Sequence, residues 1–232
     1  MIDWHSHILP EMDDGSRDVA ESISMLEMLT SQGVLTVVAT PHFYANDESV
    51  EQFLERREQS FGILQKALPE NAPQIILGAE VRYYAGISHM ENLKSLRIQG
   101  TKLLLLEMPM ATWTEYMIRE LIELASQRGI RLVLAHIERY IPLQKRETWI
   151  RLARNGIIMQ VNASYFISLA SRRKAISRLV DGDVQLLGTD CHNMTNRPPK
   201  MGQATDFIRK KLGDDYLTQM CQYGYALLNE NN

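Results

Sequence analysis

The fold is decided by stretches such as residues 34–42, which read VLTVVATPH. The run Val34–Thr40 is apolar and rich in β-branched residues, which is typical of a buried strand, and Pro41 ends it. We expect a helix just before this strand, because apolar residues recur at helical spacing between Asp18, a suitable helix cap, and Gly33, a suitable helix end. His42 follows the strand directly.

The same alternation of apolar strands and amphipathic helices continues along the chain. Further strands are expected at Met1–Trp4, Gln74–Leu77, Lys102–Leu106, Arg131–Ala135, Gly156–Val161 and Val184–Gly188. Further helices are expected at Ser49–Leu68, Tyr116–Arg128, Leu143–Asn155, Ile167–Val180, Gln203–Leu212 and Tyr216–Leu228. This pattern predicts an α/β fold with a parallel sheet covered by helices, formed by residues 1–232 as a single domain.

Composition excludes several classes of protein. With 25 Lys+Arg against 28 Asp+Glu, the net charge is −3, which does not suit a dedicated nucleic-acid binder. Two cysteines are too few for a disulfide framework. No targeting segment is apparent, and no apolar run approaches the roughly 20 residues that span a bilayer. We therefore expect a cytoplasmic protein with no stable membrane insertion and no nucleic-acid partner; the oligomeric state stays open.

Each predicted strand leads to residues whose side chains are suited to bind metal or phosphate. These residues, in strand order, are His5 and His7, His42, Glu80, Glu107, His136, Asn162, and finally Asp190 with His192. The alternation alone also fits a doubly wound open sheet. In a parallel barrel, however, all the carboxyl ends of the strands meet at one face, where active sites form. The placement therefore favours a closed barrel of about seven strands, a (β/α)7 barrel of the TIM type.

Taken singly, these elements have ordinary alternatives. A His5-x-His7 pair points both imidazoles to one face of a strand, but alone it is a weak sign of a metal site. Asp13-Asp14-Gly15 is by itself a common turn sequence. A carboxylate at the end of a buried strand, such as Glu80 or Glu107, could pair with an arginine instead of a metal.

Taken together, the candidates point to several metal ions. The set holds five histidines and four carboxylates: His5, His7, His42, His136, His192, Asp14, Glu80, Glu107 and Asp190. This exceeds the ligands that one ion can use, so two or three ions are implied. Mixed imidazole and carboxylate ligands suit Mn²⁺, Fe²⁺ or Zn²⁺, and clustered ions promote phosphoryl transfer to water.

Two arginines add a place for phosphate. Arg139 follows His136, and Arg197 follows His192. A guanidinium beside clustered metals is the expected partner of phosphate oxygens, although each could instead lie on the surface or pair with a carboxylate.

Cys191 and Arg197 have the C-x5-R spacing of cysteine-dependent phosphatases. In those enzymes a loop cradles phosphate with its backbone N–H groups, and glycine is usual there. Here the loop has no glycine and Pro198-Pro199 follows it. We therefore interpret Cys191 as a small buried side chain.

Two other features are expected to lie on the surface. His89 is far from any strand end. The basic run Arg172-Arg173-Lys174, with Arg178, is most simply a solvated helix face, and the alternative is that it docks an acidic partner.

The ordered set of motifs resembles the polymerase and histidinol phosphatase (PHP) superfamily. It is most similar to the metal-dependent protein tyrosine phosphatases of bacterial capsule and exopolysaccharide loci. The motifs are Asp3-x-His5-x-His7, Asp13-Asp14-Gly15, Thr40-Pro41-His42, Glu80, Glu107, His136-x-Glu138-Arg139 and Asp190-x-His192. The resemblance covers Met1 to about Met201 and implies a distorted seven-stranded barrel with three divalent ions, usually manganese.

The resemblance also implies a role for each site residue. The first ion would be held by His5, His7, Glu80 and Asp190; the second by Glu107 and His136 with Glu80 bridging; the third by Asp14, His42 and His192. Arg139 and Arg197 would bind the phosphate, and His42 or a metal-bound water would donate a proton. The chain departs from the family pattern at several positions, among them the bulkier Tyr165 and Phe166, which could reshape the rim of the pocket.

The implied function is a metal-dependent protein-tyrosine phosphatase that uses a metal-activated hydroxide. Its substrate would be phosphotyrosine on a cognate bacterial tyrosine kinase that regulates capsular polysaccharide synthesis. Three alternatives remain from the sequence: a small-molecule phosphomonoesterase of the histidinol phosphatase type, a nuclease, and a binding module with structural metals.

Overall fold

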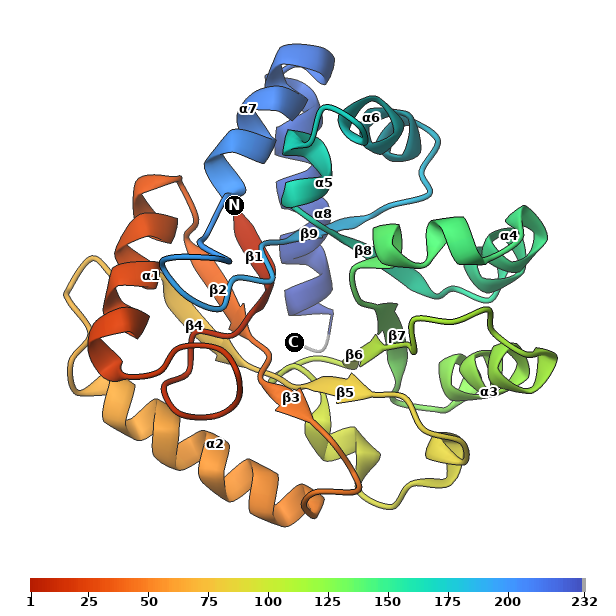
Figure 1. Cartoon of the computed structure of the whole chain (residues 1–232), viewed down its shortest axis with the longest axis horizontal. Coiled ribbons are helices and arrows are strands. Elements are labelled where there is room, and N and C mark those ends of the chain that lie inside the picture. The colour runs from red at the N-terminus through yellow and green to blue at the C-terminus, as the bar shows by residue number, and fades with distance from the viewer. Residues whose placement is uncertain (231–232) are drawn as a thin grey trace.

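The structure is a computed structural model that describes residues 1–230 (Figure 1). Its strands are β1 (Ile2–Ser6), β2 (Thr36–Ala39), β3 (His42–Phe43), β4 (Gln74–Leu77), β5 (Glu80–Arg82), β6 (Leu103–Glu107), β7 (Arg131–Leu134), β8 (Ile158–Asn162) and β9 (Leu186–Gly188). They form a sheet ordered β1-β2-β4 and a second ordered β3-β5-β6-β7-β8-β9, and all their pairings are parallel. The predicted α/β fold with a parallel sheet is confirmed.

Helices follow most of the strands, and all but the last of the α-helices lie around the outside of the sheet (Figure 1). They are α1 (Val19–Ser31), α2 (Val50–Gln65), α3 (Glu115–Ser126), α4 (Arg146–Arg154), α5 (Ser164–Ile167), α6 (Arg172–Val180), α7 (Met201–Leu212) and α8 (Asp214–Asn229). Short 3-10 helices lie at Ile87–His89, Leu93–Leu96, Ile137–Arg139 and Ile141–Leu143. The helix expected at Ile167–Val180 is instead divided into α5 and α6. No helix in the described part of the chain is long and apolar enough to cross a membrane.

The predicted ends of the first helix are confirmed. The Asp18 side chain accepts a hydrogen bond of 2.8 Å from the backbone N–H of Glu21, as an N-cap residue does. Gly33, just after the helix, has a φ of 80°, a left-handed conformation that glycine adopts without strain.

Within residues 1–230 the number of strands differs from the seven expected, because a further short strand follows each of two expected strands. Thr40-Pro41 separates β2 from β3, and Gly78-Ala79 separates β4 from β5. Backbone hydrogen bonds from Gly78 to Ala39 (2.8 Å) and from Glu80 to Pro41 (2.9 Å) keep the two segments paired across the break. The sequence patterns missed β3 and β5 because each is only two or three residues long.

The sheet curls so that its last strand approaches its first. Just beyond β9, the backbone N–H of Asp190 donates to the carbonyl of His5 (2.7 Å), and His7 donates to Cys191 (2.9 Å). Ser6 and Cys191 form a parallel bridge. This curled parallel sheet fits a TIM-like fold.

Two apolar cores hold the strands in place. Side chains on the outer face, such as Val37 and Leu104, pack against the helices. Inward-facing side chains, such as Trp4 and Leu105, form a second cluster that includes Leu227 of α8. Figure 1 shows α8 running behind the ring of strands. Because α8 packs on the start of β1, it covers the amino ends of the strands and leaves the carboxyl ends for chemistry.

Candidate metal centre

The side chains that the sequence suggested as metal ligands converge at the carboxyl ends of the strands. Three groups have ligand atoms within 4.8 Å of one another: His5 with His7 and Asp190; His42 with Glu80 and Glu107; and His7 with Asp14, His42 and His192. His136 lies beside the second group, with its Nε2 2.9 Å from Glu80 Oε1 and 3.4 Å from Glu107 Oε1. All nine candidates therefore belong to one continuous cluster.

The first group surrounds the ends of β1 and β9. The Nε2 atoms of His5 and His7 lie 3.2 Å apart. His5 Nε2 is 3.3 Å from Glu80 Oε2 and 3.6 Å from Asp190 Oδ1, and His7 Nε2 is 3.4 Å and 3.5 Å from the same two atoms. Two imidazole nitrogens and two carboxylate oxygens thus face a common point.

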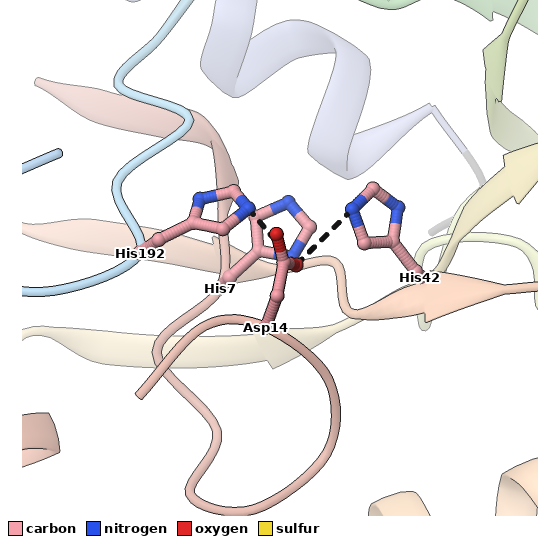
Figure 2. Close-up of side chains that lie close together, drawn as sticks. All are labelled: His7, Asp14, His42 and His192. Atoms are coloured by element: carbon pink, nitrogen blue, oxygen red, sulfur yellow. Dashed lines mark ion pairs between the residues drawn. The ribbon is translucent and has the colours of Figure 1, made fainter. Parts of the chain in front are cut away.

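The third group is shown in Figure 2, where His42 and His192 approach Asp14 from opposite sides. Asp14 Oδ1 lies 3.4 Å from His42 Nε2 and 3.3 Å from His192 Nε2. The His7 ring lies behind Asp14 in this view, 3.9 Å from the His192 ring between centroids. His7 is therefore shared between the first and third groups, whereas the resemblance placed it with the first ion alone.

Glu80 lies at the centre of the cluster and tests whether a metal fits. Its side chain is buried, and its Oε2 has no hydrogen-bond partner within the described chain. That oxygen nevertheless lies 2.9 Å from His42 Nδ1 as well as close to His5 and His7. A buried carboxylate among imidazole nitrogens, without hydrogen-bonding geometry, is the arrangement that a divalent cation would complete.

The electrostatics keep the carboxylates ionised. Burial would raise the pKa of the Glu80 carboxyl, but His5 and the other imidazoles hold it well below its usual range. Asp190 follows the same pattern, again with His5 as the main opposing charge. Although burial opposes it, Glu107 and Glu80 raise the pKa of the His136 imidazole to about 9. The cluster therefore attracts cations, and protons compete with metal for it.

Residues to which the sequence analysis gave no role support the candidate ligands. Asp13 accepts from His7 Nδ1 at 2.7 Å and from the backbone N–H of His42 at 2.8 Å. Gln160 Oε1 lies 3.4 Å from His5 Nδ1 and 2.6 Å from the backbone nitrogen of His136. Such partners fix the orientation of ligating imidazoles. A polar residue within the buried strand β8 was the signal that could have identified Gln160.

Irregular backbone positions three of the candidate ligands. Between Asp3 and Ser6, β1 has one residue more than its partner strand, a bulge that redirects His5. His136 and Asp190 have φ values of 34° and 53°, which are uncommon for residues with a side chain. His136 lies two residues after the end of β7, and Asp190 lies two residues after the end of β9, so the chain accepts local strain where it presents these groups.

The two predicted phosphate-binding arginines border the cluster. Arg197 Nη2 lies 2.8 Å from Asp190 Oδ1, and Arg139 Nη2 contacts Asp190 Oδ2. Together with Asn162 and Ser164 they line a pocket of about 130 Å³. A third arginine, Arg82, which the sequence reading missed, lies 2.5 Å from Glu107 Oε2. A small pocket lined by guanidinium groups beside anionic ligands suits a phosphate group.

The cysteine-dependent alternative does not fit the geometry. Cys191 is buried as expected, and burial raises the pKa of its thiol. The loop does not offer its backbone to phosphate, because Asn193 Oδ1 accepts from the backbone N–H groups of Thr195, Asn196 and Arg197 at 3.1, 2.8 and 3.1 Å.

Two further expectations from the sequence, for His89 and for Tyr165 with Phe166, have different outcomes. His89 is exposed, as expected. Phe166 is buried in the core and does not shape the rim, so that part of the expectation is wrong. Tyr165 is only partly buried and lines a groove between α4 and α6.

Comparison with known proteins agrees with this geometry. The family model for capsular polysaccharide synthesis proteins CpsB/CapC matches residues 1–227. The chain is 33% identical to the tyrosine-protein phosphatase CpsB of Streptococcus pneumoniae, over 92% of this chain and 91% of that one. It is 29% identical to the tyrosine-protein phosphatase YwqE of Bacillus subtilis, over 98% and 91% of the two chains.

Among solved structures, the fold matches one from a study of YwqE and CpsB as metal-dependent tyrosine phosphatases. The TM-score is 0.82, the identity is 23%, and the match covers 100% of this chain and 95% of that one. The resemblance inferred from the motifs is thereby confirmed. The chain belongs to the CpsB/CapC family of capsular polysaccharide synthesis proteins.

Proposed function

We propose that this chain is a metal-dependent phosphatase that hydrolyses phosphotyrosine in proteins. The observation that carries the proposal is the continuous cluster of nine ligands beside a pocket lined by Arg139 and Arg197. The relatives CpsB and YwqE are named tyrosine-protein phosphatases, which favours a protein substrate over a small phosphomonoester.

The cluster is proposed to hold three divalent ions, with manganese as the native metal. His5, His7, Glu80 and Asp190 would hold the first, and Glu107 and His136, with Glu80 bridging, the second. Asp14, His42 and His192 would hold the third. When bound, such ions lower the pKa of a coordinated water and clamp the oxygens of a phosphoryl group.

The chain's own residues position the substrate. Arg139 and Arg197 would bind the non-bridging phosphoryl oxygens and offset their charge in the transition state. Both arginines contact Asp190 in this structure, so they are already held facing the cluster. His42 is partly exposed and could donate a proton to the tyrosyl oxygen as it leaves. A phenol has a pKa of about 10, so this step needs little help.

We further propose that β2 with β3, and β4 with β5, each act as one bent strand, which gives a closed barrel of seven. The substrate we propose is phosphotyrosine on a bacterial tyrosine kinase that regulates capsule synthesis, in the cytoplasm. The family description, capsular polysaccharide synthesis, supports this choice.

The test is a panel of phosphotyrosine peptides, histidinol phosphate and oligonucleotides, assayed with added Mn²⁺. We expect hydrolysis of the peptides, its loss on chelation with EDTA, and its return when Mn²⁺ is restored. Undiminished activity after complete metal removal would contradict the proposal. Faster turnover of histidinol phosphate than of any peptide would favour the small-molecule alternative.

A further inference from the structure

A second groove lies beside the phosphate pocket, between α4 and α6. Its volume is about 790 Å³, and its walls include Arg146 and Arg154 from α4 with Lys174 and Arg178 from α6. Trp149 and Tyr165 supply aromatic surface. In Figure 1 the two helices follow one another along the right-hand edge of the fold, with a gap between them. Part of the basic run noted in the sequence therefore faces a groove.

Three of the four basic side chains that line this groove are unpaired within the described residues. Arg146, Arg154 and Lys174 are exposed, and none has an ion pair or side-chain hydrogen bond in residues 1–230. Arg178 differs, because its Nη1 lies 3.0 Å from Asp183 Oδ2. With Asp181 as the other acidic lining residue, the walls keep a surplus of positive charge. Unpaired cations around a groove raise the local concentration of anionic ligands.

Helix α5 borders both the phosphate pocket and the groove. Asn162, at the end of β8, donates to Asp190 Oδ2 at 2.8 Å, and Asn162 and Ser164 line the phosphate pocket. The next residue, Tyr165, lines the groove. A peptide whose phosphotyrosine enters the pocket would therefore meet the groove within a few residues.

Another pocket beside the cluster lacks such unpaired cations. It has a volume of about 640 Å³ and is lined by Asp13, Asp14, Asp47 and Glu48, and its Arg56 is paired with Glu48 at 2.9 Å. Acidic residues of a substrate would therefore be attracted to the groove and not to this pocket.

We propose that the groove between α4 and α6 binds acidic residues that flank the phosphotyrosine of the substrate protein. This inference rests on the proposed phosphotyrosine phosphatase function and specifies which substrates the site prefers. The aromatic side chains would contact the stems of the bound residues, and the three unpaired cations would bind their carboxylates.

The test compares three phosphotyrosine peptides of equal length, with acidic, neutral or basic flanks, and free phosphotyrosine. The groove variant is R146E/R154E/K174E. The matched control is K66E/K102E/R128E, which changes the net charge equally at exposed cations without ion pairs in the described chain, near the amino ends of the strands. The Mn²⁺-loaded proteins are assayed for kcat and KM. Binding of an acidic peptide with a non-hydrolysable phosphonate in place of phosphate is measured by fluorescence anisotropy.

For the unmodified protein we expect kcat/KM for the acidic peptide to exceed that for the neutral one by roughly tenfold, mainly through KM. The groove variant should lose this preference and bind the acidic phosphonate peptide at least about tenfold more weakly, whereas the control stays within about threefold. Free phosphotyrosine should be hydrolysed equally by all three proteins, which also shows that the variants fold. Added salt should reduce the preference. The milder variant R146Q/R154Q/K174Q should shift in the same direction.

Equal effects of the groove and control variants would overturn the proposal, as would equal rates on acidic and neutral peptides. Binding of anionic lipid vesicles through the groove, without any effect of peptide charge, would overturn it in favour of a membrane surface. A failure of the proposed function itself looks different, because then no phosphotyrosine ester, free or in a peptide, would be hydrolysed.

Discussion

The substitution Glu80→Gln tests the centre of the cluster with almost no change in shape. It replaces a buried carboxylate by an amide of the same size. The two carboxylate oxygens of Glu80 lie 2.9–3.4 Å from nitrogens of His5, His7, His42 and His136. The amide keeps one oxygen but loses the negative charge that these histidines and any bound cations share.

The expected magnitude follows from the number of ions that Glu80 would contact. Loss of even an indirect partner of a metal ligand typically costs about 10- to 100-fold in metal affinity or activity. Glu80 contacts members of all three ligand groups and would bridge two ions. We therefore expect the 10- to 100-fold factor to apply once for each of the two ions. The combined loss is about 10²- to 10⁴-fold in kcat/KM, or roughly 3–5 kcal/mol.

The assay combines phosphotyrosine hydrolysis with metal content measured by elemental analysis. Glu120→Gln is the matched control, since Glu120 is also buried but accepts from the Tyr83 hydroxyl and the Gly86 backbone N–H, both at 2.7 Å, away from the cluster. The control should lower stability by about 1–3 kcal/mol and keep its metal. If Glu80→Gln retains full metal content and near-normal kcat/KM, the reasoning about Glu80 is refuted.

Three further predictions concern other parts of the site. Cys191→Ser should keep kcat within about threefold, because the thiol lies in the core; a complete loss of turnover with the fold intact would restore the cysteine mechanism. Gly188→Ala should destabilise the protein by about 1–3 kcal/mol in thermal or denaturant unfolding, because the new methyl group would lie 2.6 Å from His5 Cβ. Unchanged stability and metal content would contradict the close packing of Gly188 against His5. Apparent Mn²⁺ affinity should fall as the pH is lowered from 9 to 7, by up to tenfold per pH unit for each proton displaced. The reason is that His136 without metal has a pKa of about 9, so below this pH it holds a proton that the metal must displace. If calorimetry shows no dependence of the affinity on pH, His136 is not a ligand.

Much of the site could be predicted because short stretches of sequence indicate both the strands and the candidate ligands that follow them. A strand of apolar residues followed by His42 or Glu107 can be recognised without knowing what lies across the sheet. The rule that parallel strands point their carboxyl ends to one side then brings distant ligands together. The supporting roles of Asp13, Gln160 and Arg82 could not be predicted from the sequence, since a single acidic, amide or basic residue has many ordinary roles.

The sequence by itself determined the alternation of strands and helices and the chemical types of the ligands, because both depend on local periodicity and side-chain chemistry. Only the tertiary structure decided that His7 is shared between two ligand groups and that Arg139 and Arg197 both contact Asp190. It also decided where the strands break, and it placed three unpaired cations along one groove. These features depend on distances between residues far apart in the chain, and such distances are fixed only when the sheet curls and its bulges and left-handed residues redirect the side chains.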